Sequence, residues 1–386
     1  MKKTFGDITI NVEQLLFVIL VMVFCITASN EVGSSLSIYK YIILVICIIE
    51  SFFKYKKQKK KFNKIYAFKE IKSLIFCVIV IFLFSFIRSI IESKFSFRTV
   101  QEILFLVSPM IYAYFLINCL SQKQINSIMK VSLLIVLFFY IFSLNLNAKE
   151  IINALLNSSF SESSSALESH IYSGFALSFC IYFCYFSNEK IYKYLSLLFV
   201  IMTFKRFSII VAFILYFLSN SKAKKIAVSK KVYVITGIIL LGFSILYYNL
   251  MLPENVIMIE NNYNLDVSKL TSTRSDRLHD LIYSSYESYG FGSSTEYMYN
   301  HFYGALEMDI VKIIIELGYI PVIILIFVYL YVGKTNLYAF SVMCCQVISL
   351  VFSSNLTSSF AWILIFVTLF LISKYKDVER SKNEIS

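Results

Sequence analysis

The feature that most constrains this chain is its succession of long apolar runs. Of its 386 residues, 58% are hydrophobic and only 16% are charged, with a mean hydropathy of +0.72. A soluble domain has roughly 45–50% apolar and about 25% charged residues. Three prolines and ten glycines leave long helices uninterrupted. The composition therefore predicts an all-α polytopic membrane protein, with 1–386 as a single membrane domain.

Twelve apolar segments have the character of membrane-spanning helices, which need about 20 mostly apolar residues. They are 12–29, 36–53, 71–91, 100–119, 125–144, 170–187, 191–204, 207–219, 232–250, 309–332, 336–354 and 358–373. The pair 191–204 and 207–219 is short and is equally interpretable as one long helix. That interpretation would reduce the number of spans to eleven.

Lysine and arginine decide between the two counts, because cytoplasmic loops carry the excess of both. With twelve spans and the N-terminus inside, most of the 36 Lys and Arg lie inside, including the runs Lys54–Lys72 and Lys222–Lys231. A single helix over 191–219 would place one of those runs outside. The sequence therefore favours twelve spans, both termini in the cytoplasm and a tight outside turn at Thr203–Phe207.

Charge and cysteine usage exclude several other classes. The net charge of +12 follows from the topology, so the basic run Lys54–Lys64 indicates a loop beside anionic lipid and not a nucleic-acid site. All eight cysteines lie in apolar spans, which implies no disulfide framework. Cys180 and Cys184 are interpreted as packing residues. We find no metal-binding motif and no Gly-rich phosphate loop, and we expect neither a metal nor a cofactor.

The longest segment that a bilayer could not hold is 251–308, between the ninth and tenth spans. It contains two of the three histidines, and the predicted topology places it on the extracytoplasmic side. The Ser- and Asn-rich segment 145–169 and the turn Thr203–Phe207 open to the same side. A polar extracytoplasmic substrate would be met there, so we interpret 251–308 as a catalytic loop.

Lys205 and Arg206 stand between two apolar runs with no acidic residue nearby. Such cations can simply extend to the outer interface as anchors. Ionisable residues at membrane depth are nevertheless functional candidates by default. We interpret Arg206 as catalytic and Lys205 as a substrate-binding residue.

The stretch Thr271–Gly290 predicts a short amphipathic helix on the outer membrane surface. Thr273 can cap its N-terminus, with Asp276 as the capping-box partner, and Gly290 supplies the C-terminal stop. The apolar residues that share one face of this helix are Leu278, Leu281, Ile282 and Tyr286.

Arg274 and Arg277 fall in the first turn of this predicted helix. A helix N-terminus attracts anions, and the planar guanidinium group binds phosphate oxygens bidentately. The turn therefore predicts a site for phosphate or pyrophosphate, with Arg274 catalytic and Arg277 substrate-binding. The alternative is that both arginines only pair with Asp276 and Asp280.

The segment Gly290–Glu307 combines a tight turn at Gly290 and Gly292 with many aromatic residues. Aromatic rings suit stacking on sugars and equally an interfacial aromatic belt; those present are Phe291, Tyr297, Tyr299, Phe302 and Tyr303. We assign Tyr299 and Tyr303 to substrate binding. His301 and Glu307 are both candidate general bases.

Four charged residues mark the entry to the tenth span: Glu307, Asp309, Lys312 and Glu316. Lys312 can pair along one helix face with Glu316 or with Asp309, and we favour Glu316. Asp309 lies at the outer rim beside the expected anion site, where it is a further substrate-binding candidate.

This arrangement resembles the O-antigen polymerases (Wzy) and the related O-antigen ligases. The likeness in architecture covers roughly the whole chain, and three short motifs follow in order: TFKRF, TRSDRL…YGFG and LEMDIVKIIIELGYIPV. The resemblance places Arg206 on one family arginine and Arg274, with Arg277 as the alternative, on another. It matches Glu316 and Gly318 to the family's E-x-G.

The departure from the family pattern is at its histidine, which falls at Glu307 in this chain. Either Glu307 replaces that histidine, or the loop is shifted in register and His301 serves as the base.

The resemblance implies a metal-independent glycosyltransferase at the outer face of the bacterial plasma membrane. Such an enzyme transfers a growing glycan from undecaprenyl pyrophosphate to the terminal sugar of the next lipid-linked repeat unit. The implied partners are that lipid-linked oligosaccharide, the lipid bilayer and a chain-length regulator. The alternatives are a ligase of the same family, a flippase and a structural subunit. The clean spans favour an enzyme, because transporters often contain broken helices.

Overall fold

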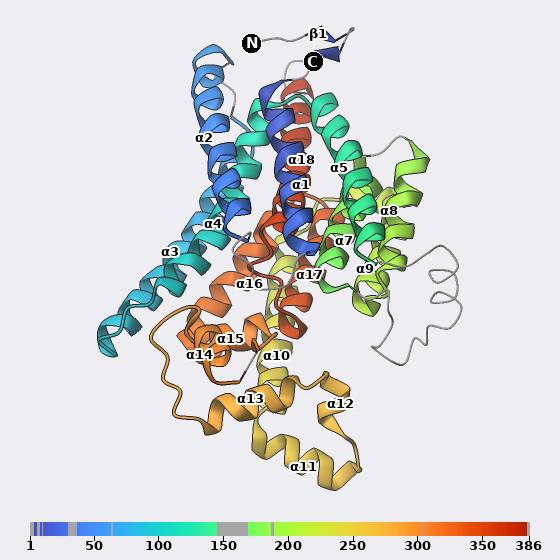
Figure 1. Ribbon diagram of the computed structural model, residues 1–386. Coiled ribbons are helices and arrows are strands. Elements are labelled where there is room, and N and C mark those ends of the chain that lie inside the picture. Colours follow the sequence, from blue (N-terminus) through green and yellow to red (C-terminus); the bar gives the residue numbers. More distant parts are fainter. Residues whose placement is uncertain are drawn as a thin grey trace. The chain divides into compact units, whose positions relative to one another are not determined.

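The computed structural model describes residues 4–5, 8–9, 11–29, 37–62, 65–144, 169–186, 189–302 and 304–383. Most of them are helical (Figure 1), and a short antiparallel pair joins β1 (Thr4–Phe5) to β2 (Ile8–Thr9). Most of the segment 145–169, which we expect on the extracytoplasmic side, lies outside the described residues.

Five helices are long and apolar enough to cross a membrane: α3 (Phe68–Ile91), α4 (Phe97–Cys119), α5 (Gln122–Ser143), α10 (Lys230–Leu250) and α18 (Ser359–Asn383). The shorter apolar helices are α1 (Val12–Ser29), α7 (His170–Phe186), α9 (Arg206–Asn220), α16 (Tyr319–Gly333) and α17 (Leu337–Phe352). The remaining elements of this part of the chain are α2 (Ser37–Phe62), α8 (Lys190–Met202) and η1 (Lys222–Lys225). These lengths and compositions indicate a helical membrane protein.

The chain divides into two compact units. Unit 1 consists of Met1–Phe68, Ser108–Lys225 and Ser359–Ser386, and unit 2 consists of Lys69–Val107 and Ile226–Ser358. Helix α4 contributes to both units, and Pro109 lies inside this helix directly after the division.

Aromatic side chains hold the helices of unit 1 together. The ring of Phe360 in α18 packs edge-on against Phe175 of α7, with centroids 4.8 Å apart, and stacks on Phe24 of α1 at 5.3 Å. Helices α8 and α9 are separate, joined by a turn in which Phe204 has a left-handed φ of 50°. The prediction of two short helices in place of one long helix is confirmed.

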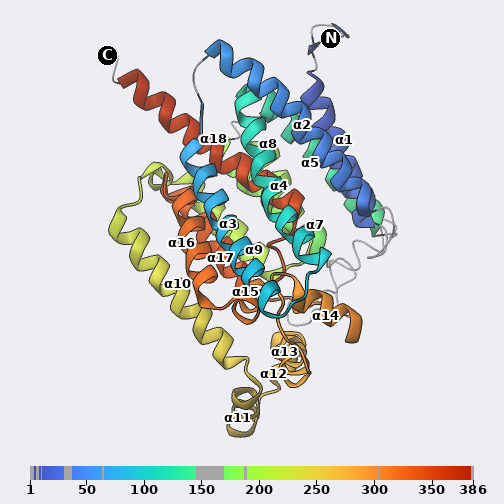
Figure 2. The ribbon, with the colours of Figure 1, turned by 90° about the vertical axis from the view of Figure 1, so that its left-hand side faces the viewer.

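In unit 2, helices α10, α16 and α17 pack side by side (Figure 2). The segment 251–308 forms α11 (Pro253–Tyr263), α12 (Val267–Thr271), α13 (Arg274–Tyr283) and α14 (Ser293–His301), followed by α15 (Asp309–Leu317). A small apolar core joins this segment to the ends of α10 and α15; its buried side chains are Met251, Leu278, Leu281, Met298, Leu306, Met308 and Val311. This core fixes α13 and α14 against the protein.

The expected segment 309–332 is not one continuous helix, because the structure divides it into α15 and α16. Gly318 ends α15 with φ 88° and ψ −172°. This backbone conformation is open to glycine and strained for residues that carry a Cβ. An apolar run does not reveal such a break, because both helices continue the same hydrophobic pattern.

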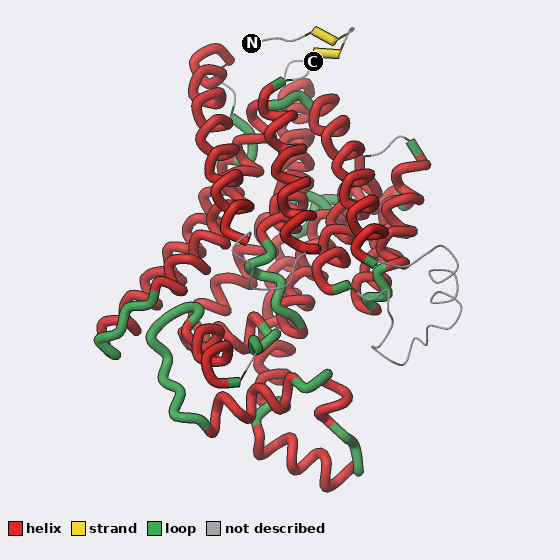
Figure 3. Tube along the Cα trace, in the orientation of Figure 1, coloured by secondary structure: helices red, strands yellow, loops and turns green. Residues whose placement is uncertain are grey.

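Helix α13 begins at Arg274 as expected, but its caps differ from the prediction. Thr273 has φ 64° and makes no side-chain cap hydrogen bond, so the capping box is absent from this described turn. The helix ends at Tyr283, and Gly290 instead lies in the irregular loop before α14 (Figure 3). The apolar face of the helix packs into the small core through Leu278 and Leu281. Its expected location on the outer membrane surface stays a prediction.

Candidate functional site

Two arginines from the first turn of α13 reach the same carboxylate. Nη1 of Arg277 lies 2.8 Å from Oε1 of Glu307, and Nη2 of Arg274 lies 3.7 Å from Oε2. Backbone carbonyls also accept from both guanidinium groups, since Nη1 of Arg277 donates to Ala305 at 2.9 Å and Nη1 of Arg274 donates to Thr271 at 3.0 Å. The structure thus brings together three of the residues that we assign to the site.

The alternative prediction, in which Arg274 and Arg277 pair only with Asp276 and Asp280, is wrong. Asp276 accepts hydrogen bonds from the hydroxyls of Ser268 and Ser275, and Asp280 lies 3.8 Å from the ring of His279. Both aspartates are close to the arginines in sequence, whereas Glu307 approaches from the far end of the loop.

The arginine–glutamate cluster carries an excess of positive charge and is partly open to solvent. The side chains of Arg274, Arg277 and Glu307 are 16%, 30% and 38% exposed. Nε of Arg274 is buried and has no hydrogen-bond partner among the described residues. Glu307 has a left-handed φ of 41°, a conformation that is uncommon for residues other than glycine. Two guanidinium groups against one carboxylate make this turn suited to an incoming anion.

His301, the other candidate base, is the last residue of α14 and is exposed. Its ring stacks on Tyr297 with centroids 4.1 Å apart, and its Nδ1 lies 2.9 Å from the carbonyl oxygen of the same tyrosine. Tyr299 is 49% exposed, and Tyr303 lies outside the described residues. Of the two candidate bases, Glu307 is the one that contacts the arginines.

Tyr286 ties the loop after α13 to the start of α14. Its hydroxyl lies 2.7 Å from that of Ser293, and its ring packs edge-on against Tyr297 at 5.3 Å. Burial, and then the nearby carboxylate of Glu316, raises the pKa of Tyr286 above its ordinary value. The phenol therefore keeps its proton at neutral pH and stays a hydrogen-bond donor.

A buried ionic group joins α4 to α15, and our sequence analysis missed two of its members. Lys312 of α15 bonds the carboxylate of Glu102 in α4, and Arg98 donates from Nε to the same carboxylate at 2.9 Å. Glu102 and Lys312 are buried. The predicted Lys312–Glu316 pair is therefore wrong, because the lysine goes to another helix. The signal was present, since one acid in the span 100–119 and one base in 309–332 are natural partners.

Glu316 instead holds the backbone at the start of α14. Its carboxylate accepts from the amides of Gly292 and Ser294, both at 2.8 Å, and from the Ser294 hydroxyl at 2.6 Å. The side chain of Glu316 is fully buried. A carboxylate that accepts several N–H and O–H groups is well matched to a helix N-terminus, so Glu316 fixes where α14 begins.

Serines of α3 fix the turn that precedes α14. The hydroxyl of Ser89 donates to the carbonyl of Tyr289 at 2.6 Å, and the amide of Phe291 donates to Ser85 at 3.1 Å. The backbone comes so close that a Cβ at Gly290 would lie 3.1 Å from the Ser85 carbonyl oxygen. Only a glycine fits here, and the predicted tight turn is confirmed.

Asp309 is directed into the protein. Its carboxylate accepts from the backbone amides of Asn355 and Leu356, each at 2.6 Å, and the side chain is buried. It therefore connects the start of α15 to the loop between α17 and α18. Its assignment to substrate binding stays a prediction.

Lys205 and Arg206 belong to unit 1, whereas the arginine–glutamate cluster belongs to unit 2. Lys205 occupies the N-cap of α9, and Arg206 is the exposed first residue of that helix. Both therefore stand at a helix N-terminus, where the backbone already favours negative charge.

No family model, curated protein or solved structure matches this chain. Within the described residues, no group of three His, Cys, Asp or Glu side chains is arranged to hold a metal ion. The assignment of function therefore rests on the residues of this chain alone.

Proposed function

We propose that this protein polymerises lipid-linked oligosaccharide repeat units, as the O-antigen polymerases that it resembles do. The growing glycan would leave an undecaprenyl-pyrophosphate carrier and join the terminal sugar of the next lipid-linked unit. The observation that carries the proposal is the arginine–glutamate cluster, in which Arg274 and Arg277 hold Glu307 within a polar loop of a helical membrane protein.

The cluster suits a pyrophosphate leaving group. Glu307 contacts the guanidinium N–H groups that a diphosphate would bind. Nε of Arg274 is a further donor with no acceptor among the described residues. An incoming diphosphate would displace the carboxylate from the arginines. Guanidinium groups fixed in place can stabilise the negative charge that develops on the leaving oxygen.

The displaced carboxylate can then act as the base. In the proposed step, the acceptor hydroxyl oxygen bonds to the anomeric carbon, and the bond from that carbon to the pyrophosphate oxygen breaks. The electron pair stays on the pyrophosphate, and Glu307 takes the proton of the hydroxyl. His301 is the alternative base. The role that the resemblance implies for Arg206, which is to stabilise the leaving group, stays a prediction.

The proposal includes a topology of twelve spans, with α15 and α16 together forming the span 309–332. Both termini then lie in the cytoplasm, and the segment 251–308 lies on the extracytoplasmic side of a bacterial plasma membrane. This topology is favoured by the distribution of lysine and arginine.

A transporter for lipid-linked oligosaccharide is the second candidate, and two features of the structure favour it. The break at Gly318 and the buried charges of Glu102 and Lys312 are features that transporters use around their substrates. In this chain the buried charges are paired with one another, and Glu316 is satisfied by backbone amides. This pairing favours a structural role for the break over a transport pathway.

Deletion of the gene separates the candidates. The surface polysaccharide of the deletion strain is resolved on a gel, and its lipid-linked precursors are assigned to the inner or outer leaflet. Loss of a polymerase leaves single repeat units attached, loss of a ligase leaves none, and loss of a flippase accumulates precursor in the inner leaflet. We expect single repeat units. An unchanged ladder of chain lengths would contradict all three functions.

A further inference from the structure

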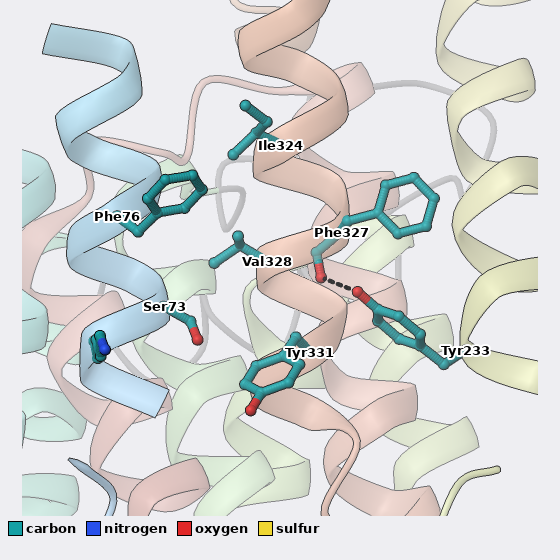
Figure 4. A pocket seen from close by; sticks show the side chains of 8 residues that line it. Ser73, Phe76, Tyr233, Ile324, Phe327, Val328 and Tyr331 are labelled. Carbon is teal, nitrogen blue, oxygen red and sulfur yellow. Dashed lines mark hydrogen bonds between the residues drawn. The ribbon is translucent and has the colours of Figure 1, made fainter. Parts of the chain in front are cut away.

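A groove of about 440 Å³ opens in unit 2, where α3 and α10 flank α16 (Figure 4). Its size falls within the roughly 300–1,000 Å³ that small-molecule sites occupy. All the residues that line it belong to unit 2, and the segment 251–308 contributes none of them. The groove is therefore separate from the arginine–glutamate cluster.

The long wall of the groove is apolar, and the polar atoms along it are already used. Phe76, Ile324 and Val328 line it, and Figure 4 shows them in succession along α3 and α16. The hydroxyl of Tyr233 donates to the carbonyl of Phe327 at 3.0 Å. The Ser73 hydroxyl is also hydrogen-bonded within its own helix, since it donates to the carbonyl of Lys69 at 2.9 Å. A polar solute would find few partners along this wall.

Phe327 reaches the groove because α10 carries a glycine opposite it. A Cβ at Gly237 would lie 2.5 Å from the Phe327 ring. The ring therefore rests directly on the backbone of α10, and helices α10 and α16 close the groove on that side. Residues of α3 line the opposite side, so the three helices enclose a largely apolar channel.

The polar groups of the groove gather at one end. Lys72 is exposed at the start of α3, and Figure 4 places Tyr331 at the end opposite Ile324. Lysines concentrate in the same region, because α3 and α10 both begin there and α16 ends there; they are Lys69, Lys72, Lys230, Lys231 and Lys334. The Lys334 ammonium stands 3.6 Å from the centroid of the Tyr331 ring. Glu70 is the acid in the first turn of α3. The five lysines outnumber it, so this end of the groove carries a net positive charge.

An apolar channel with a cationic end matches the two parts of an anionic phospholipid. In a bilayer the channel fills with hydrocarbon, and basic pockets between spanning helices bind anionic headgroups. We propose that this groove binds one anionic phospholipid, its acyl chain along Phe76, Ile324 and Val328 and its phosphate at Lys72 and Tyr331. The predicted topology assigns that lipid to the cytoplasmic leaflet, opposite the proposed catalytic face.

Native mass spectrometry of the purified full-length protein tests this assignment. Dioleoyl phosphatidylglycerol, dioleoyl phosphatidylcholine and undecaprenyl phosphate are titrated separately and in equimolar pairs. We expect the wild-type protein to bind phosphatidylglycerol more tightly than phosphatidylcholine. Lys72→Gln should weaken phosphatidylglycerol binding about fivefold, the effect of one lysine near a charged headgroup. Val328→Trp fills the groove and should weaken binding of both phospholipids.

Lys269→Gln is the matched control, because Lys269 is an exposed lysine that does not line the groove and lies outside the basic runs. It should leave the preference for phosphatidylglycerol unchanged. Equal binding of the two phospholipids to the wild-type protein would overturn the proposal. The same would follow if Lys72→Gln behaved like Lys269→Gln, or if undecaprenyl phosphate displaced phosphatidylglycerol at equal concentration.

Discussion

Two charged groups in unit 2 each combine two cations with one glutamate, and they differ in burial and in the elements that they join. In the arginine–glutamate cluster, Arg274 and Arg277 meet a carboxylate that is 38% exposed. In the buried group, Lys312 and Arg98 meet Glu102, whose side chain is 2% exposed. The first group forms within one loop, and the second joins two helices.

The difference lies in what each group can release. An exposed ion pair contributes only about 0–1 kcal/mol, so an anion can displace Glu307 without unfolding the loop. A buried pair that loses one partner leaves an uncompensated charge, which costs about 3–5 kcal/mol. The buried group therefore fixes the scaffold, and the exposed cluster is free to exchange its carboxylate for a ligand.

The largest expected effect is on the buried group. Lys312→Met should destabilise the protein by about 3–5 kcal/mol, because Glu102 then keeps a buried charge whose remaining partner, Arg98, is partly exposed. Denaturant unfolding of the purified protein in detergent measures this change. The double variant Lys312→Met/Glu102→Gln should regain part of the loss, since it removes both charges. An unchanged stability in the single variant would contradict a structural role for the pair.

The next effect is on activity and not on stability. Arg274→Ala and Arg277→Ala should each lower polymer formation by about 10²–10³, the range found when one donor to a developing charge is removed. Stability should change by less than in Lys312→Met, because these side chains and Glu307 stay partly open to solvent. Complementation of the deletion strain, with protein levels measured in the membrane fraction, provides both readings.

Lys269→Ala is the control for the arginine variants. Lys269 is a cation of the same loop, but its side chain is 86% exposed and pairs with Asp266. It should support a normal ladder of chain lengths. A full ladder in both arginine variants would exclude the anion site, whatever the function of the protein.

A smaller effect is expected at the turn that Glu316 and the serines of α3 hold. Gly292 has φ 93°, and a Cβ there would lie 3.1 Å from Cδ of Glu102. Gly292→Ala should therefore destabilise the protein by about 1–3 kcal/mol. Gly242→Ala is the matched control, since a Cβ at Gly242 meets nothing within 4 Å. Equal stability of the two variants would contradict the tight fit of the turn.

The smallest effect is expected at His301. The residue is exposed and contacts Tyr297, and replacement of such surface residues usually changes stability by less than about 0.5 kcal/mol. His301→Ala should also retain a ladder of chain lengths, whereas Glu307→Gln should lose it. Loss of the ladder in His301→Ala with retention in Glu307→Gln would exchange the roles of the two residues.

The sequence predicts those features that depend on neighbouring residues. The apolar runs locate the helices to within a few residues at most ends, and the distribution of lysines separates α8 from α9. The start of α13 at Arg274 and the turn at Gly290 were also predictable, because glycine and polar residues interrupt the pattern locally.

Features that depend on distant residues were not predictable in the same way. Lys312 and Glu102 are 210 residues apart along the chain, so spacing within one helix wrongly favours Glu316 as the partner of the lysine. Arg277 likewise pairs with Glu307 and not with its neighbour Asp280. The break at Gly318 was missed because hydropathy continues across it. In each case tertiary packing, and not local pattern, selects the outcome.

The most direct test of the account is the binding of undecaprenyl pyrophosphate to the purified protein. The wild-type protein should bind it, and the double variant Arg274→Ala/Arg277→Ala should bind at least tenfold more weakly, since two guanidinium donors to the diphosphate are lost. Lys269→Ala should bind as tightly as the wild type. Equal affinity of the wild type and the double variant would contradict the claim that the arginine–glutamate cluster is a diphosphate site.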